Sequence, residues 1–375
     1  MRSERRAPAD YYEWREFEAR LAGRTIRFMA KPGLPDWERA DPAAVLLSES
    51  IEIGHGERLL ELNAGAGIVA VAAALRGARV TTLTDSAIAA EATRRTLAIN
   101  GVSACDRLPW YDVAVVTLPK SRQSARRAIV DACRALRPGG RIYLGGPNRG
   151  GVKRAIEDLR EMFGSAEVVA YGKGHRVAAA VRPERLVLHA DDGFSETELD
   201  VRDARWRVVS APGVFARDRL DDGTRRLVGT MTVRAGESLL DLGCGCGIVG
   251  LVAARLGARV TLVDVSAAAV EATRRTLALN AVVDADVLWC DCASAVMDRR
   301  FDVVATNPPF HQGVGTDDAV ARQFVHDSAR VLRPGGRLYL VANRFLRYER
   351  DMSGLFSHVR VAWEDGRFRV LEAVK

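Results

Sequence analysis

The sequence predicts an α/β protein built from two tandem domains, each holding a mainly parallel β-sheet with helices on both faces. The first observation is an internal repeat: residues 59–100 align without gaps on residues 239–280, and 26 of the 42 positions are identical. The second is that each copy alternates short apolar segments with segments of helical period, as strand–helix–strand units do. The third is a further match of residues 134–141 with 330–337, which extends the repeat along both copies.

The second copy opens with an apolar strand, residues 239–242, that runs into three alternating glycines, Gly243, Gly245 and Gly247. Glycine lets the backbone turn sharply and approach a ligand closely. A helical pattern over residues 248–256 follows. This strand, loop and helix indicate a nucleotide-type cofactor, although the glycine pattern alone would also fit a dinucleotide.

The next predicted strand, residues 258–263, ends in Asp264, whose carboxylate is placed to accept hydrogen bonds from two ribose hydroxyls. A helix over residues 267–279 follows, then a third strand with Asp291 after it, then a strand over residues 301–306. S-adenosylmethionine (SAM) has a ribose and an adenine but no pyrophosphate. This second half therefore favours SAM over a dinucleotide.

The strand over residues 301–306 ends at Asn307-Pro308-Pro309-Phe310. Two consecutive prolines cannot continue a sheet ladder, so the chain must leave the sheet here as a rigid loop. The loop offers one side-chain amide, backbone carbonyls and one aromatic ring. This set suits a planar group that bears an NH2, because the oxygens accept its hydrogens and the ring stacks on its face.

The first copy differs from the second where chemistry would occur. In order, Glu61 stands for Asp241, Asn63 for Gly243, Thr84 for Asp264 with Asp85 one place later, and Thr117-Leu118-Pro119-Lys120 for the proline loop. A shift of one residue in a strand points a side chain to the other face. We therefore expect the first copy to keep the fold and to lack the acceptor loop.

These differences predict a domain plan. Residues 1–181 are expected to form a degenerate methyltransferase-like domain that serves as a scaffold and docks RNA. The polar segment 182–195 is expected to be a linker, and residues 196–375 the catalytic SAM-dependent domain.

Two smaller elements are predicted near the starts of these domains. Residues 197–202 and 205–210 have the pattern of a short hairpin. Four aromatic residues near the N-terminus are expected to form one face of a helix packed on the first domain: Tyr11, Tyr12, Trp14 and Phe17.

Composition and charge narrow the class of protein. The chain has 375 residues, 48% of them hydrophobic, and a mean hydropathy of −0.06. We find no apolar run of membrane-spanning length and no signal peptide pattern, so we expect a cytoplasmic monomer without a membrane partner. The net charge of +7 and the pI of about 9.3 fit an anionic partner such as RNA, with basic residues concentrated between Lys120 and Arg154.

The cysteines do not indicate a metal site. Cys244 with Cys246, and Cys290 with Cys292, form two pairs with a single residue between them. The usual zinc spacing has two or more residues between paired cysteines, and no histidine completes a set here. We expect no metal, and no structural disulfide in the cytoplasm.

Taken together, these residues resemble the ribosomal RNA small-subunit methyltransferase C family, bacterial enzymes that methylate N2 of a guanine in 16S rRNA. The resemblance covers nearly the whole chain. The segments that carry it are residues 212–215, 220–224, 241–247, 307–313, 341–346 and 366–370.

The resemblance implies two Rossmann-like class I methyltransferase domains with seven-stranded sheets, the second of which binds SAM. For the cofactor it implies Asp241, Gly243, Gly245 and Gly247 at the methionine part, Asp264 at the ribose, Asp291 at the adenine N6 amine, and Asn307 beside them. For the substrate it implies Asn307 and Pro308 as acceptors of the two guanine N2 hydrogens, Phe310 stacked on the base, and Pro309 and His311 near it.

Three other functions remain open. The protein could be a 23S rRNA guanine-N2 methyltransferase, or a methyltransferase of a protein glutamine, because a primary amide also presents an NH2. It could also be a non-catalytic RNA-binding assembly protein. Phe310 in place of the tyrosine typical of glutamine and adenine enzymes favours RNA, and the intact second-copy motifs favour catalysis. Ribosomal RNA or the small ribosomal subunit is the expected partner.

Overall fold

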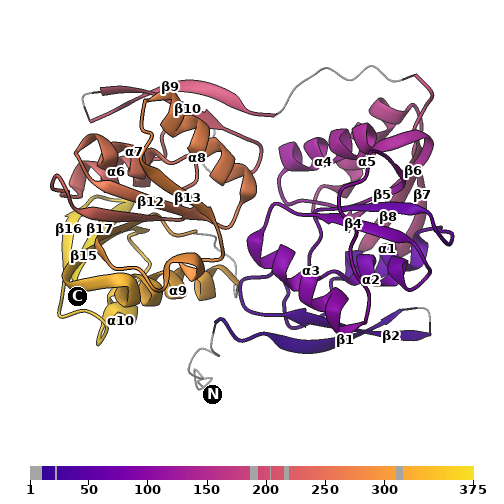
Figure 1. Ribbon diagram of the computed structural model, residues 1–375, viewed down its shortest axis with the longest axis horizontal. Helices are drawn as coiled ribbons and strands as arrows, with labels where there is room; N and C mark the ends of the chain where they lie inside the picture. Colours follow the sequence, from indigo (N-terminus) through magenta and orange to yellow (C-terminus); the bar gives the residue numbers. More distant parts are fainter. Residues whose placement is uncertain (1–10, 22, 186–192, 203, 215–218, 310–315) are drawn as a thin grey trace. The chain divides into compact units, whose positions relative to one another are not determined.

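The computed structural model describes residues 11–21, 23–185, 193–202, 204–214, 219–309 and 316–375 (Figure 1). Contacts divide the chain into two compact units. The N-terminal unit runs from Tyr12 to Asp192, and the C-terminal unit comprises Gly193–Lys375 together with Tyr11. The boundary between them falls inside the segment 182–195 that the sequence marks as a linker. Among the described residues, no helix is both long and apolar enough to cross a membrane.

The N-terminal unit has a six-stranded sheet in the order β4-β3-β5-β6-β8-β7. Its first four strands in that order are parallel, and β8 and β7 pair antiparallel at the edge. The strands are β3 (Arg58–Leu62), β4 (Arg79–Leu83), β5 (Tyr111–Thr117), β6 (Leu136–Pro147), β7 (Glu167–Gly172) and β8 (His175–Val181). The helices are α1 (Pro42–Ser50), α2 (Ile68–Ala74), α3 (Ala87–Ile99), α4 (Arg122–Ala135) and α5 (Val152–Phe163).

The C-terminal unit has a seven-stranded sheet in the order β13-β12-β11-β14-β15-β17-β16. The strands are β11 (Ser238–Leu242), β12 (Arg259–Asp264), β13 (Ala285–Trp289), β14 (Phe301–Thr306), β15 (Leu332–Asn343), β16 (His358–Glu364) and β17 (Phe368–Val374). The helices are α6 (Asp222–Thr230), α7 (Ile248–Arg255), α8 (Ala267–Leu279), α9 (Thr316–Val331), α10 (Glu349–Met352) and the 3-10 helix η1 (Ser294–Val296). The first five strands in the sheet order are parallel, so their carboxyl ends share one edge.

Helices cover both faces of the N-terminal sheet, as the sequence predicts. Successive residues of a strand point to opposite faces. Accordingly Leu59 and Val113 pack in the core under α1, α2 and α3, whereas Leu60 and Ala114 pack in a second core under α4 and α5. The α/β architecture with two mainly parallel sheets is therefore confirmed.

The expectation of seven strands in each sheet is wrong for the N-terminal unit, which lacks a counterpart of β13. Eleven residues, 100–110, connect α3 to β5, whereas twenty-one, 280–300, connect α8 to β14. The shorter connection has no room for a full strand, and Pro109 removes a ladder donor. One strand-like contact remains, in which the Cys105 N–H donates to the Val80 carbonyl at 2.6 Å.

Each unit also carries a hairpin, which lies against α3 in the N-terminal unit and against α8 in the C-terminal unit (Figure 1). The predicted hairpin of the C-terminal unit is confirmed as β9 (Ser195–Val201) and β10 (Ala204–Ser210). Its counterpart is β1 (Arg15–Leu21) with β2 (Arg24–Ala30). The Val209 N–H donates to Thr276 Oγ1 of α8 at 2.9 Å, and the Met29 N–H donates to Thr96 Oγ1 of α3 at 2.8 Å. The repeat thus includes the hairpins.

The helix expected around the N-terminal aromatics is wrong: Tyr11 and Tyr12 lie in a turn, and Phe17 lies in the strand β1. Burial along β1 alternates, with Ala19 and Leu21 inside, which is the period of a strand and not of a helix. Trp14 and Phe17 do pack on the core of the N-terminal unit. Tyr11 does not, since it belongs to the C-terminal unit.

Candidate functional site

The site lies at the carboxyl edge of the C-terminal sheet, where β12, β11 and β14 are neighbours. Their parallel register brings the loops after Leu242, Asp264 and Thr306 to one edge. The Thr306 hydroxyl donates to the Leu242 carbonyl at 2.7 Å and ties the ends of β14 and β11 together. The glycine loop, Asp264 and Asn307 are therefore brought to the same edge, as the sequence predicts for a single site.

The glycine loop has a shape that other residues would strain. Gly243 and Gly247 have φ of 78° and 80°, in the left-handed region. A Cβ on Gly247 would lie 2.7 Å from Cγ2 of Thr273, so α7 starts in close contact with α8. A Cβ on Gly245 would meet nothing within 4 Å. The loop thus packs tightly at Gly247 and faces open space at Gly245.

Asp264 joins the end of β12 to the glycine loop. Its Oδ2 accepts a hydrogen bond from the Gly245 N–H at 2.9 Å, and its Oδ1 accepts one from the Ser266 N–H at 2.9 Å. The carboxylate is only partly buried. A partly exposed carboxylate fixed by two backbone donors at a strand end suits the ribose contact predicted for it.

Asp241 is a buried residue that bonds to the helix after the glycine loop. Its side chain is buried, and its Oδ2 accepts a hydrogen bond from the Gly250 N–H in the first turn of α7 at 2.9 Å. Burial raises the pKa of this carboxyl to about 7. Glu61 in the N-terminal unit is equally buried and lies against the Ala70 backbone, also with its pKa raised to about 7 by burial. This position therefore orients the start of a helix in both units and does not distinguish them.

Asp291 follows β13 in a loop that is fixed at both ends. The Cys290 N–H donates to the Asp264 carbonyl at 3.0 Å, and the Ala293 N–H donates to Oδ2 of the buried Asp327 at 3.1 Å. The helix η1 is capped by Ala293 without a side-chain bond, so Asp291 is not its capping residue. The Asp291 Oδ1 instead accepts a hydrogen bond from the Tyr11 hydroxyl at 2.8 Å.

Asn307 is held so that its carbonyl has one orientation. The amide nitrogen donates to Asp221 Oδ2 at 3.1 Å and to Thr224 Oγ1 at 2.9 Å. Because a carboxylate can only accept, the NH2 must face Asp221 and the carbonyl must face away. The Asn307 Oδ1 is buried and has no hydrogen-bond partner among the described residues. Buried acceptors are normally paired, so this oxygen is prepared for a donor.

Asp221 and Thr224 are site residues that sequence reasoning missed. Asp221 caps α6, since its Oδ2 accepts a hydrogen bond from the Thr224 N–H at 2.9 Å, and the same oxygen also holds Asn307. The segment 220–224 is noticed in the sequence only as part of the family resemblance. A comparison of the two copies carries a signal: Asp41 keeps the acid, whereas Ala44 and Thr117 replace the other two partners.

The structure describes the proline loop as far as Pro309. Pro308 is buried behind Asn307, and Pro309 is exposed. Phe310 and His311 lie outside the described residues, so their predicted contacts with the base stay predictions.

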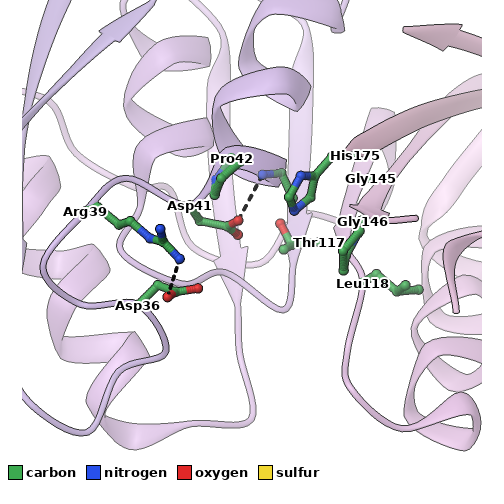
Figure 2. A pocket seen from close by; sticks show the side chains of 11 residues that line it. Asp36, Arg39, Asp41, Pro42, Thr117, Leu118, Gly145, Gly146 and His175 are labelled. Carbon is green, nitrogen blue, oxygen red and sulfur yellow. Dashed lines mark hydrogen bonds and ion pairs between the residues drawn. The ribbon is translucent and has the colours of Figure 1, made fainter. Parts of the chain in front are cut away.

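The N-terminal unit keeps a hollow of about 230 Å³ at the position that Asn307 and Asp221 occupy in the C-terminal unit (Figure 2). Its polar groups largely bond to neighbours within the unit. Arg39 pairs with Asp36 at 2.7 Å, and Oδ1 of Asp41 accepts a hydrogen bond from the Ala43 N–H at 2.9 Å. The other residues that line it include Thr117, Leu118, Gly145, Gly146 and His175.

Asn63 joins two strand ends in the N-terminal unit. It stands where Gly243 stands and keeps a left-handed φ of 57°. Its side-chain amide donates to the Thr117 carbonyl at 2.8 Å. The first unit thus uses an asparagine side chain to tie the ends of β3 and β5 together.

The cysteines are all thiols and are not joined in disulfides. Burial raises the pKa of Cys246 to about 11 and raises that of Cys290, so neither is a reactive thiolate. In the parts of the chain that the structure describes, no three His, Cys, Asp or Glu side chains gather in a group suited to a metal ion.

Comparisons with known proteins agree with this geometry. Family models match twice: the methyltransferase small domain over residues 205–372, and the methyltransferase small domain N-terminal over residues 63–173. The ribosomal RNA small subunit methyltransferase C of Hahella chejuensis is 34% identical over 315 residues, which cover 82% of this chain and 91% of that protein. The corresponding Pseudomonas aeruginosa protein (strain UCBPP-PA14) is 36% identical, over 69% of this chain and 78% of its own.

One solved structure is similar over both units. It is the T. thermophilus 16S rRNA N2 G1207 methyltransferase in complex with AdoMet and guanosine, with a TM-score of 0.81 and 33% identity over 96% of this chain and 98% of that one. With two matching domain models and relatives at least 34% identical of which it covers 78% and 91%, this chain belongs to the ribosomal RNA small subunit methyltransferase C family.

Proposed function

We propose that this protein transfers a methyl group from SAM to the exocyclic N2 amine of a guanine in 16S rRNA. The observation that carries the proposal is the Asn307 carbonyl, a buried acceptor with a fixed orientation and no partner among the described residues. The relatives named above act on small-subunit rRNA, and the T. thermophilus structure holds AdoMet and guanosine, the same cofactor and nucleoside.

The residues at the sheet edge fit SAM. The open space at Gly245 allows close backbone approach, Asp264 suits two ribose hydroxyls, and Asp291 suits the adenine amine. Asp241 supports this arrangement through the Gly250 N–H. When bound, SAM supplies a methyl group on a positively charged sulfur that is a good leaving group.

The acceptor side explains why an amine is the target. The guanine N2 lone pair is delocalised into the ring, so an unconstrained amine is a poor nucleophile. The Asn307 Oδ1 and the Pro308 carbonyl accept the two N–H bonds and thereby set the direction of that lone pair. Two fixed oxygens of this kind contribute through positioning and electrostatic stabilisation, and no side-chain base is needed before transfer.

The test is to map rRNA methylation by mass spectrometry in cells that lack the protein. We expect one guanine of 16S rRNA to lose its N2 methyl group, and the purified protein with SAM to restore it. Loss of a 23S rRNA methyl group, or of a release-factor glutamine methyl group, would identify one of the alternative substrates instead. Unchanged methylation of all of these would leave only the non-catalytic assembly role.

For the N-terminal unit we propose a scaffold that docks RNA through three of the basic residues between Lys120 and Arg154. Arg122 and Arg126 pair with Asp158, which is 2% exposed, so both serve to compensate a buried charge. Three other cations are exposed and form no ion pair with described residues: Lys120, Arg149 and Lys153. They lie just after β5 and β6, at the carboxyl edge of the sheet.

Changing Lys120, Arg149 and Lys153 together to glutamine should weaken rRNA binding and leave SAM binding unchanged. The salt dependence should fall by about 0.7 log–log unit for each phosphate that the variant no longer neutralises. A fluorescence-anisotropy salt titration measures both quantities.

The matched control changes three exposed arginines to glutamine at the hairpin turn and at the start of β4: Arg20, Arg24 and Arg79. It removes the same charge and should alter the slope far less. Equal effects in the two variants would mean that only net charge matters, and no effect in either would leave this unit as a scaffold alone. The cytoplasmic location and the monomeric state expected from the sequence stay predictions.

A further inference from the structure

Tyr11 is a buried residue of the C-terminal unit that comes from the far end of the chain. Its side chain is 5% exposed, and its hydroxyl donates to Asp291 Oδ1 at 2.8 Å across 280 positions of sequence. Burial raises the pKa of this hydroxyl, so it stays protonated and remains a donor. The bond thus joins a buried neutral donor to a partly buried carboxylate, and hydrogen bonds to an ionised group are stronger than those between neutral groups.

The backbone around Asp291 is fixed independently of Tyr11. The bonds from Cys290 to Asp264 and from Ala293 to Asp327 hold the loop at both ends. Cys292 completes a tight turn with a left-handed φ of 48°. The Asp291 carboxylate is contacted at Oδ1 by the Cys292 thiol, which donates at 3.5 Å, and more closely by the Tyr11 hydroxyl, which donates at 2.8 Å.

We infer that Tyr11 is a positioning residue for the adenine subsite, holding the Asp291 carboxylate in the orientation that accepts the adenine N6 amine. This inference rests on the proposed function, in which Asp291 meets adenine. A carboxylate has two oxygens and about four acceptor positions, so it accepts from the tyrosine and from an amine together. A purine with a carbonyl at C6 places an oxygen against the carboxylate and is rejected.

The test compares S-adenosylhomocysteine, which has an amine at C6, with S-inosylhomocysteine, which has a carbonyl at C6 and a hydrogen on N1. Isothermal calorimetry on the full-length protein measures both affinities. The wild type should prefer the adenosyl ligand. Tyr11→Phe should weaken that ligand about tenfold, the scale of one hydrogen bond to a charged group, and should change the inosyl ligand less than twofold.

Two further variants make the result specific. Tyr12→Phe removes a hydroxyl from the next residue and should leave both affinities unchanged. In an Asp291→Ala background, Tyr11→Phe should have little further effect, because the bond it breaks is already gone. Thermal unfolding of Tyr11→Phe checks that the fold is retained.

Equal weakening of both ligands in Tyr11→Phe would mean that the tyrosine only stabilises the fold, and unchanged affinities would mean that it does not orient Asp291; either result overturns the inference while the proposed function stands. Failure of the wild type to bind S-adenosylhomocysteine would overturn the proposed function, and the inference with it.

Discussion

Asn307→Ala is expected to abolish rRNA methylation while SAM affinity changes by less than about twofold. The variant removes the one buried carbonyl prepared for the guanine amine and leaves the glycine loop and Asp264 untouched. Removing a single preorganised group that acts in the transition state typically costs about 10²–10³ in rate. Single-turnover methylation of 16S rRNA, with SAM binding measured by calorimetry on the same protein, separates the two effects.

Two companion variants sharpen this result. Thr224→Val removes one acceptor of the Asn307 amide and keeps the carbonyl, so it should lower the rate by a smaller factor. Thr117→Ala makes a comparable truncation at the matching position of the N-terminal unit and should leave the rate unchanged. If Asn307→Ala methylated rRNA at the wild-type rate, the acceptor assignment would be wrong.

Asp264→Ala should weaken SAM binding by roughly 1.5–3 kcal/mol, about 10- to 150-fold, because a charge-assisted bond is removed. The structure adds a second reason, since the same carboxylate holds the Gly245 and Ser266 N–H groups and thereby shapes the glycine loop. Calorimetric titration with SAM measures the loss directly.

The control is Asp85→Ala in the N-terminal unit. Asp85 lies one place beyond the position that matches Asp264, next to Thr84, whose hydroxyl accepts from the Ser86 N–H at 3.4 Å. We expect no change in SAM affinity, since SAM is proposed to bind the C-terminal unit alone. Equal losses from the two variants would contradict that assignment.

The sequence predicts most of what is local in this fold. The repeat, the glycine loop and the double proline each depend on neighbouring residues, and the structure places the sheets, the loop and the strand end as they imply. The absence of a fifth parallel strand at the edge of the N-terminal sheet was not predicted, because the number of strands was inferred from the resemblance and not from the shorter connection of residues 100–110.

Contacts between distant segments could not be predicted in the same way. Asp221 meets Asn307 across 86 positions, and Tyr11 meets Asp291 across 280. Nothing in the periodicity around Tyr11 shows that this residue belongs to the C-terminal unit and not to the core that Trp14 and Phe17 pack on. The sequence does offer a clue to the partners of the Asn307 amide, because Thr224 of the second copy corresponds to Ala44 of the first.

The bond between Asn63 and the Thr117 carbonyl makes the strand edge of the first unit hard to convert into that of the second by a single substitution. Asn63→Gly alone breaks the bond and provides no acceptor amide. Thr117→Asn alone introduces the amide beside Asp41 but without the hydroxyl that Thr224 supplies in the second unit, since residue 44 is alanine. Neither substitution alone therefore reproduces the arrangement around Asn307, so a second methyl-transfer site in this chain would require several simultaneous changes.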